Sequence, residues 1–249
     1  MHLLVKERSP YNEITVYETS ELFGERGRFR VLEFGGNAVQ GAVNLKAPAH
    51  IVLEYPRAVI HLMEYNLPSF NRLFMIGHGI GTIAGRYPER DVIVAEIDER
   101  VVTASRTLFG YTRDNIAIGD GRQLLSEQTP CRYDFIVVDA FTKAGTPVHL
   151  TSLQFAELAR EKLALHGCLI MNLAGRPVGD KRMNAIGATL REAFRHVAAF
   201  VLPGRDADRR EERNLLLVAG NREILYDPHS MAGFVQVELE QGYIIRDKG

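Results

Sequence analysis

The segment that decides the fold is Leu73-Phe74-Met75-Ile76-Gly77-His78-Gly79-Ile80-Gly81-Thr82. Its first four residues form a short apolar run that is typical of a strand buried on both faces. Three glycines then alternate with other residues before a stretch that favours a helix. Glycine adopts left-handed backbone conformations readily and lets a ligand approach the main chain closely. The segment therefore predicts a strand, a tight turn and a helix, with either a ligand or close packing at the turn.

The next strand-like run carries an acid at its end. This run, Val92–Ile97, contains Glu96, which lies 19 residues after Gly77. A carboxylate at this spacing from a glycine-rich turn is placed to accept hydrogen bonds from ribose hydroxyls. The glycine turn and Glu96 together predict a nucleoside ligand, and a surface acid at a strand end is the alternative.

Two further strand ends supply carboxylates. Asp120 follows the run Asn115–Ile118, and Asp139 follows Phe135–Val138. Ligands of open α/β sheets bind outside the carboxyl ends of the strands, so we expect these acids and Glu96 at one edge of the sheet. Three carboxylates suit a cationic nucleoside without phosphate, such as an S-adenosyl sulfonium. They do not suit the pyrophosphate of a nicotinamide dinucleotide, which is a distant alternative.

Short apolar runs alternate with helical stretches over the rest of the chain, which predicts a parallel sheet covered on both faces. The remaining strand candidates are Cys168–Leu173, Phe200–Leu202 and Leu215–Ala219, and the helix candidates are residues 51–65, Val101–Phe109, Leu153–Leu165 and Lys181–Arg195. The last two strands are joined by the charged run Arg205–Arg213, which has no helical apolar face. We therefore predict a solvated loop there and antiparallel pairing of these two strands.

The first 48 residues have a different pattern. Glu13–Glu18 and Phe29–Phe34 alternate polar and apolar residues as half-buried strands do, and Gly35-Gly36-Asn37 is typical of a turn. We expect a small antiparallel β unit in residues 1–48 and an α/β domain in residues 49–249.

The composition excludes several classes of protein. With 46% hydrophobic and 24% charged residues, the chain is globular and not disordered. Its formal net charge of -1 lacks the basic excess of proteins that bind nucleic acid through phosphates. No apolar run approaches the roughly 18 residues that cross a membrane, and early charges argue against a secretory signal. We interpret Cys131 and Cys168 as reduced thiols of a cytoplasmic protein, and no residue cluster has the spacing of a metal site.

Several segments in combination resemble the spermidine synthase (polyamine aminopropyltransferase) family. They are Ser9-Pro10-Tyr11, Phe34–Gln40, Ile76–Thr82, Ala95–Val102, Gly119–Arg122 and Tyr133–Asp139. Asp139-Ala140-Phe141 and residues 147–151 are most similar to the divergent bacterial branch. The resemblance implies a seven-stranded methyltransferase-like (Rossmann-like) sheet behind the N-terminal β unit, and a homodimer. It also implies aminopropyl transfer from decarboxylated S-adenosylmethionine to a small amine acceptor.

The resemblance further implies roles for individual residues. For the nucleoside, it places Glu96 at the ribose and Asp120 at the adenine, with Gly121 beside Asp120. Around the sulfonium side chain it places Gly77, Gly79 and Gly81, with Gln40 as a contact from the β unit. It places Asp139 near the attacking amine and Tyr55 where it helps hold that amine. Asp139 is then the candidate base, because an alkyl ammonium with a pKa of about 10.4 must lose a proton before it attacks.

Three positions depart from the family pattern. Ile80 and Thr142 stand where the family has carboxylates that bind ammonium groups, and Pro56 stands where it has glutamine. The loss of two carboxylates weakens binding of a cationic amine, and Ile80 does not repel the carboxylate of intact S-adenosylmethionine. The alternatives are therefore an S-adenosylmethionine-dependent methyltransferase of a small molecule and a non-catalytic adenosyl-ligand-binding protein.

Two histidines lie in the candidate loops. His149 follows the fourth strand of the predicted sheet, where it either acts as a general base near neutral pH or packs against the next helix. His78 lies inside the glycine turn, and we interpret it as a solvent-facing spacer in preference to a ligand contact.

Overall fold

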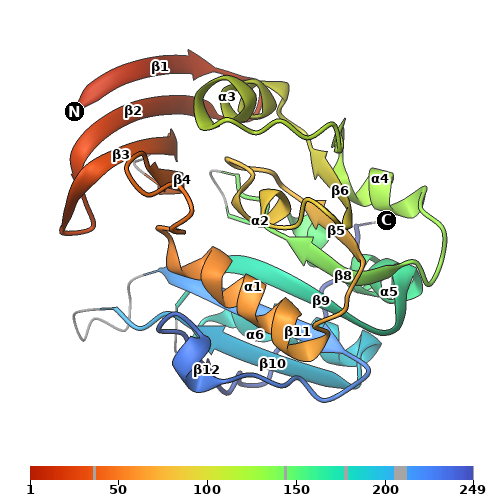
Figure 1. The fold of residues 1–249 in the computed structure, drawn as a ribbon. Coiled ribbons are helices and arrows are strands. Elements are labelled where there is room, and N and C mark those ends of the chain that lie inside the picture. Colours follow the sequence, from red (N-terminus) through yellow and green to blue (C-terminus); the bar gives the residue numbers. More distant parts are fainter. Residues whose placement is uncertain (36–37, 143–144, 177–178, 205–211, 249) are drawn as a thin grey trace.

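Two β-sheets organise the chain (Figure 1). The structure, a computed structural model, describes residues 1–35, 38–142, 145–176, 179–204 and 212–248. The N-terminal sheet is antiparallel throughout and has the strand order β1-β2-β3-β4. Its strands are β1 (His2–Arg8), β2 (Glu13–Leu22), β3 (Glu25–Phe34) and β4 (Ala38–Asn44). The predicted antiparallel unit is confirmed, with β1 and β4 added to the two strands that the sequence indicates.

The larger sheet has eight strands in the described part of the chain, in the order β12-β10-β11-β9-β8-β5-β6-β7. They are β5 (Arg72–Ile76), β6 (Asp91–Glu96), β7 (Ile116–Ile118), β8 (Tyr133–Val138), β9 (Leu163–Gly175), β10 (His196–Val201), β11 (Arg213–Gly220) and β12 (Val235–Val237). The strands from β9 to β7 pair in parallel, whereas β11 pairs antiparallel with both β9 and β10. The α/β class and the antiparallel pairing are confirmed. The short edge strand β12 makes one strand more than the seven predicted.

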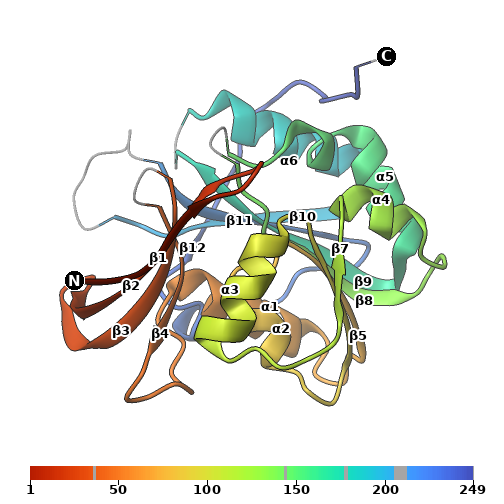
Figure 2. The same ribbon diagram turned by 90° about the horizontal axis from the view of Figure 1, so that it is seen from above.

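Helices cover both faces of the larger sheet (Figure 2). One face packs against α4 (Gly121–Ser126), α5 (Leu153–Lys162) and α6 (Lys181–Ala193), and the other packs against α1 (Glu54–Asn66) and α2 (Thr82–Gly85). Side chains alternate across β5, so Phe74 and Ile76 enter the first core and Leu73 and Met75 the second. Two short 3-10 helices, η1 (Val148–Leu150) and η2 (Pro228–Ser230), complete the described elements.

The N-terminal sheet rests on α3 (Glu99–Phe109) and on the glycine turn. Its inner face contributes Ile14, Val16 and Leu32 to a third apolar cluster with helix α3, against which Ile80 also packs. A polar contact fixes the β1–β2 turn: the Ser9 hydroxyl donates to Asp98, which also caps α3 through the Arg100 amide. The β1–β2 turn is thereby held against the start of α3, which follows the carboxyl end of β6.

Some predictions fall where nothing is described. Residues 36–37 of the predicted turn and residues 205–211 of the charged run lie outside the described residues. The division of the chain after residue 48 into two folding units stays a prediction. Within the ranges given above, no helix is both long and apolar enough to span a bilayer.

Candidate active site

A cavity of about 240 Å³ lies where β5, β6, β7 and β8 end, under the loops of the N-terminal sheet. The predicted site residues that line it are Gln40, Tyr55, Gly77, Gly79, Glu96, Asp120, Gly121 and Asp139. Gly81 does not line it. The cavity thus brings together residues that are far apart in the sequence, between Gln40 and Asp139. It lies outside the carboxyl ends of the strands, where open α/β sheets bind their ligands.

The three glycines of the turn have different reasons to be glycine. All three have positive φ, and a Cβ on Gly77 would lie only 2.0 Å from the carbonyl oxygen of Asp139. A Cβ on Gly81 would lie 2.3 Å from the Tyr111 ring, so Gly81 serves packing rather than the cavity wall. At Gly79 the nearest atom would be the Gln40 carbonyl oxygen at 3.6 Å, which is ordinary contact. Gly77 and Gly79 are the glycines that expose backbone to the cavity.

Gly121 lines the cavity and also packs closely against the strand beneath it. A Cβ there would lie 2.3 Å from Cγ2 of Ile76, so the start of α4 is pressed against the end of β5. This close approach places Asp120, the capping residue of α4, at the cavity edge.

Glu96 is buried at the end of β6 and is held by the main chain. Its Oε2 accepts from the His78 amide at 2.8 Å, and its Oε1 accepts from the Asp98 amide at 2.9 Å. Burial raises the pKa of Glu96 to about 7, and these amide hydrogen bonds offset part of the rise. Each oxygen keeps a further lone pair for a hydroxyl donor of a ligand.

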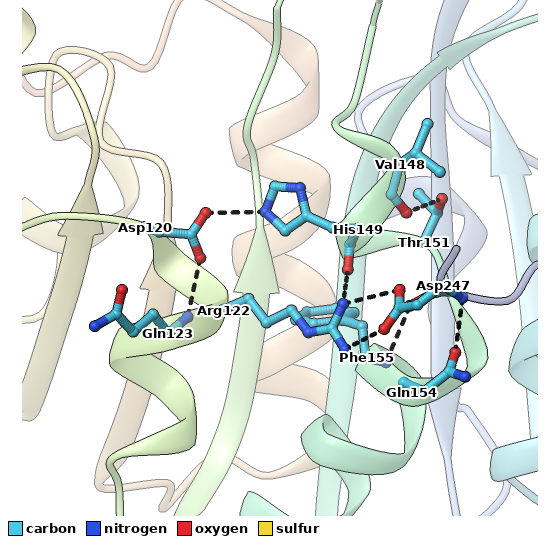
Figure 3. A network of polar contacts seen from close by, with 10 residues as sticks. Asp120, Arg122, Gln123, Val148, His149, Thr151, Gln154, Phe155 and Asp247 are labelled. Atoms are coloured by element: carbon cyan, nitrogen blue, oxygen red, sulfur yellow. Dashed lines mark hydrogen bonds and ion pairs between the residues drawn. The ribbon is translucent and has the colours of Figure 1, made fainter. Parts of the chain in front are cut away.

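Asp120 belongs to a polar network that reaches the C-terminal segment (Figure 3). Its Oδ1 accepts from the Gln123 amide at 2.9 Å, and its Oδ2 lies 3.0 Å from Nε2 of His149. Arg122 donates to the His149 carbonyl oxygen at 3.0 Å and to both carboxylate oxygens of Asp247. His149 therefore lines the cavity as the partner of Asp120, whereas the sequence suggested a base for an acceptor or a packing residue.

His78 corrects a prediction, because its side chain is buried and does not face solvent. Its Nε2 lies 2.7 Å from the Ser105 hydroxyl, which itself donates to the Val102 carbonyl oxygen. The imidazole therefore donates through Nε2, and its buried Nδ1 has no partner among the described residues that could accept a second proton, so the ring is neutral. Burial lowers the pKa of His78 to about 4, in agreement with this state. The ring also stands edge-on to Tyr111, at 4.6 Å between centroids.

Asp139, Tyr55 and Asn172 form a buried cluster at the end of β8. The Tyr55 hydroxyl is shared between the Asp139 carboxylate and the Gln40 carbonyl oxygen, which lies 3.5 Å away. Asn172 Nδ2 donates to Asp139 Oδ1 at 2.9 Å. Burial raises the pKa of Asp139, and these two hydrogen bonds oppose the rise. The pKa of Tyr55 is also raised, first by burial and then by the charge of Asp139.

Tyr55 lies in the first turn of α1, directly before Pro56. Proline fits a first helical turn because its missing N–H would have no intrahelical partner there. The departure from glutamine at this position therefore leaves the helix intact and Tyr55 in place.

Asn172 is a site residue that the sequence analysis missed. It lies on β9, one residue beyond the pairing of Met171 with Val138 of β8, and so beside Asp139. The available signal was a polar residue inside the apolar run Cys168–Leu173.

A second cavity of about 750 Å³ adjoins the first and extends toward β9 and β11. The two share Asn12, Phe34, Gln40, Tyr55, Phe141 and Thr142 as lining residues. Glu54 and Asn172 line the second cavity only. The cluster of Tyr55, Asp139 and Asn172 thus stands at the junction of the two cavities.

Ile80 lies apart from both described cavities and packs between the glycine turn and the N-terminal sheet. A Cβ on Gly41 of β4 would lie 2.7 Å from Cγ2 of Ile80, which shows how closely the two segments meet. The described segments contain no group of three or more His, Cys, Asp or Glu side chains that could hold a metal ion together.

Comparisons with known proteins agree with this fold. A polyamine aminopropyltransferase of Vibrio vulnificus is 26% identical over 221 residues, which are 83% of this chain and 70% of that one. A probable spermidine synthase from Corynebacterium glutamicum has a fold that matches with a TM-score of 0.77 at 22% identity, over 92% of this chain and 83% of that one. A spermidine synthase in complex with the transition-state analogue AdoDATO matches with a TM-score of 0.68 at 16% identity, over 97% and 82% of the two chains. Residues 53–205 match the spermine/spermidine synthase domain. Since this match covers more than half of the chain, the protein belongs to the spermine/spermidine synthase domain family.

Proposed function

We propose that the protein transfers an aminopropyl group from decarboxylated S-adenosylmethionine to a small amine. The nitrogen lone pair of the amine attacks the methylene carbon bound to the sulfonium. The carbon–sulfur bond breaks with its electron pair passing to sulfur, which yields methylthioadenosine. The observation that carries this proposal is the cluster of Asp139, Tyr55 and Asn172 at the junction of the cavity that Glu96 and Asp120 line and a second cavity.

The first cavity supplies the groups for the adenosyl part of the co-substrate. Glu96 accepts from the ribose hydroxyls, Asp120 accepts from the adenine amino group, and the backbone at Gly77 and Gly79 faces the sulfonium chain. Asp139 takes the proton that the acceptor amine must lose, and Tyr55 holds the carboxylate toward that amine. The amine enters through the second cavity, where Glu54 offers a further negative charge.

Membership of the family and the Vibrio aminopropyltransferase support this assignment. The spermidine synthase bound to AdoDATO supports the choice of co-substrate for a chain of this fold. The homodimer and the cytoplasmic location that the resemblance implies stay predictions.

The pH dependence of nucleoside affinity tests the role of Glu96. Ribose hydroxyls donate more strongly to an ionised carboxylate, and the pKa of Glu96 is about 7. We expect calorimetry to show affinity for methylthioadenosine rising about tenfold between about pH 6 and pH 8. Glu96→Gln should bind weakly at both pH values. An unchanged affinity in this variant would remove Glu96 from the ribose site.

The raised pKa of Glu96 also predicts how the stability of the protein depends on pH. Its pKa in the folded state, about 7, lies above its ordinary value of 4.5, so the folded protein keeps a proton that the unfolded chain has lost between these values. The free energy of unfolding should therefore fall as the pH rises through this window, and the slope should be smaller in Glu96→Gln. Denaturant unfolding at a series of pH values measures the slope in both proteins.

Methyl transfer from intact S-adenosylmethionine is the second candidate, and Ile80 is the observation that favours it. No acid at this position repels the carboxylate of that co-substrate. Yet Ile80 packs against β4, so an acid there would lose apolar contact instead of gaining a ligand.

Ile80→Asp separates a ligand-facing position from a packing position. We expect a free energy of unfolding lower by about 2 kcal/mol or more, and no gain in affinity for decarboxylated S-adenosylmethionine. Ile80→Val is the matched control, and it should cost about 1 kcal/mol. Tighter binding of the decarboxylated co-substrate to the aspartate variant would show that this position faces the ligand.

Calorimetric titration ranks the co-substrates directly. We expect methylthioadenosine and decarboxylated S-adenosylmethionine to bind more tightly than S-adenosylmethionine, and a nicotinamide dinucleotide not to bind. Preference for S-adenosylmethionine would favour methyl transfer. Binding of the dinucleotide alone would overturn the proposal.

A further inference from the structure

The side-chain amide of Asn172 has a hydrogen-bonded NH₂ group and an oxygen without a partner among the described residues. Its side chain is buried, with the residue 1% exposed, and Nδ2 donates to Asp139 Oδ1 at 2.9 Å. Its Oδ1 has no hydrogen-bond partner among the residues that the structure describes. A buried acceptor without a donor is costly, so its retention beside the reacting carboxylate calls for a reason.

The orientation of this amide follows from chemistry. An ionised carboxylate only accepts hydrogen bonds, and a reversed amide would set two acceptor oxygens against each other. Asn172 must therefore turn its NH₂ group to Asp139 and its oxygen away. Tyr55, from α1, is the titratable side chain that hydrogen-bonds Asp139 in the same cluster.

The free oxygen is buried in a residue that lines the second cavity, and a bound ligand is the donor that the described residues do not supply. Asn172 lines the second cavity, Asp139 lines the first, and Tyr55 lines both. A neutral primary amine has two N–H bonds and one lone pair. Two acceptors that engage its N–H bonds would leave the lone pair free to face an electrophilic carbon.

We propose that Asn172 binds the reacting amine through Oδ1 and, through Nδ2, holds the Asp139 carboxylate in the orientation that accepts the proton of that amine. This inference rests on the proposed aminopropyl transfer and adds to it a residue that selects a primary amine with two N–H donors. A tertiary amine, which has no N–H bond when neutral, would leave both acceptors unpaired.

Asn172→Asp is the principal variant, because it keeps the shape of the side chain and removes the NH₂ donor. Two neighbouring carboxylates resist double ionisation. We expect the acid limb of the kcat/KM profile to move up by about 1 pH unit or more, since the hydrogen bond that opposed protonation of Asp139 is lost. Asn172→Asp keeps an oxygen that can accept from the amine, whereas Asn172→Leu removes both the donor and the acceptor. In Asn172→Leu we therefore expect the KM for the amine to rise about tenfold or more, with methylthioadenosine affinity unchanged.

Asn184→Asp is the matched control. Asn184 is also buried and also donates to a carboxylate, that of Glu240, at 3.1 Å, but it lies on α6 and lines neither cavity. This variant should lose stability and keep the wild-type pH profile and amine KM. A folded Asn172→Asp protein with the wild-type acid limb, or a folded Asn172→Leu protein with the wild-type amine KM, would overturn the inference.

A measurement without turnover separates this inference from the proposed function. Titration of ¹³C-labelled aspartate carboxyls by NMR, with Asp139→Asn for assignment, follows Asp139 in the ligand-free protein. A raised Asp139 titration in Asn172→Asp supports the contact whether or not transfer occurs. An unshifted Asp139 titration would overturn the positioning role, and absent turnover in the wild-type protein would overturn the proposed function alone.

Discussion

Asp139→Asn is expected to lower kcat/KM for aminopropyl transfer by roughly 10²–10⁴-fold, the usual contribution of a general base. The amide cannot take the proton of the ammonium, and it leaves Tyr55 and Asn172 facing a group of different hydrogen-bonding character. Methylthioadenosine affinity should change little, because its ribose and base are assigned to other residues. A steady-state assay of methylthioadenosine release, with calorimetry, measures both quantities.

Asp134→Asn supplies the control for this prediction. Asp134 lies on the same strand, β8, where its carboxylate accepts from the amides of Asn71 and Arg72, and it does not line the cavity. Its replacement weakens the exposed carboxylate contact at the other end of β8 without touching the site, so turnover should persist. Equal loss of activity in both variants would mean that the Asp139 effect reports stability and not proton transfer.

Gly77→Ala is expected to have the largest structural effect of any substitution in the glycine turn. The residue has φ +98°, and its new Cβ would lie 2.0 Å from the Asp139 carbonyl oxygen. Left-handed strain costs about 1–2 kcal/mol, and the overlap with main chain adds about 1–3 kcal/mol. We expect a free energy of unfolding lower by about 3 kcal/mol and nucleoside binding weakened, because the end of β8 must shift.

Gly79→Ala calibrates that result. Its φ is also positive, at +56°, but the added Cβ would meet nothing closer than 3.6 Å. The expected cost is therefore the strain alone, about 1–2 kcal/mol. Denaturant unfolding of the two variants side by side measures the difference. Equal costs would contradict the close approach of Gly77 to Asp139.

The sequence predicts the centre of the fold better than its edges. The central strands β5, β6 and β8 are buried on both faces, so they appear as apolar runs with acids or glycines after them. The edge strand β12 has three residues and mostly exposed side chains, which leave no pattern to detect. Strand β1 carries a register irregularity between Leu3 and Val5 that interrupts its alternation.

The cavity was predictable because a parallel sheet collects its strand ends at one edge. Glu96, Asp120 and Asp139 could be placed there without knowledge of any contact. No comparable rule predicts contacts between segments that are distant in the sequence. The burial of His78 depends on Ser105 and Tyr111, and the packing of Ile80 depends on β4. To place Asn172 beside Asp139 one must know the register between β8 and β9, which cannot be derived from the sequence.

Direct analysis of the products tests the central claim most sharply. The protein is incubated with decarboxylated S-adenosylmethionine and a primary diamine, and the products are resolved by mass spectrometry. We predict methylthioadenosine and the diamine extended by one aminopropyl group in equal amounts, with both formed at least about a hundredfold more slowly by Asp139→Asn. A diamine that stays unmodified here, while S-adenosylmethionine yields S-adenosylhomocysteine and a methylated acceptor, would contradict aminopropyl transfer.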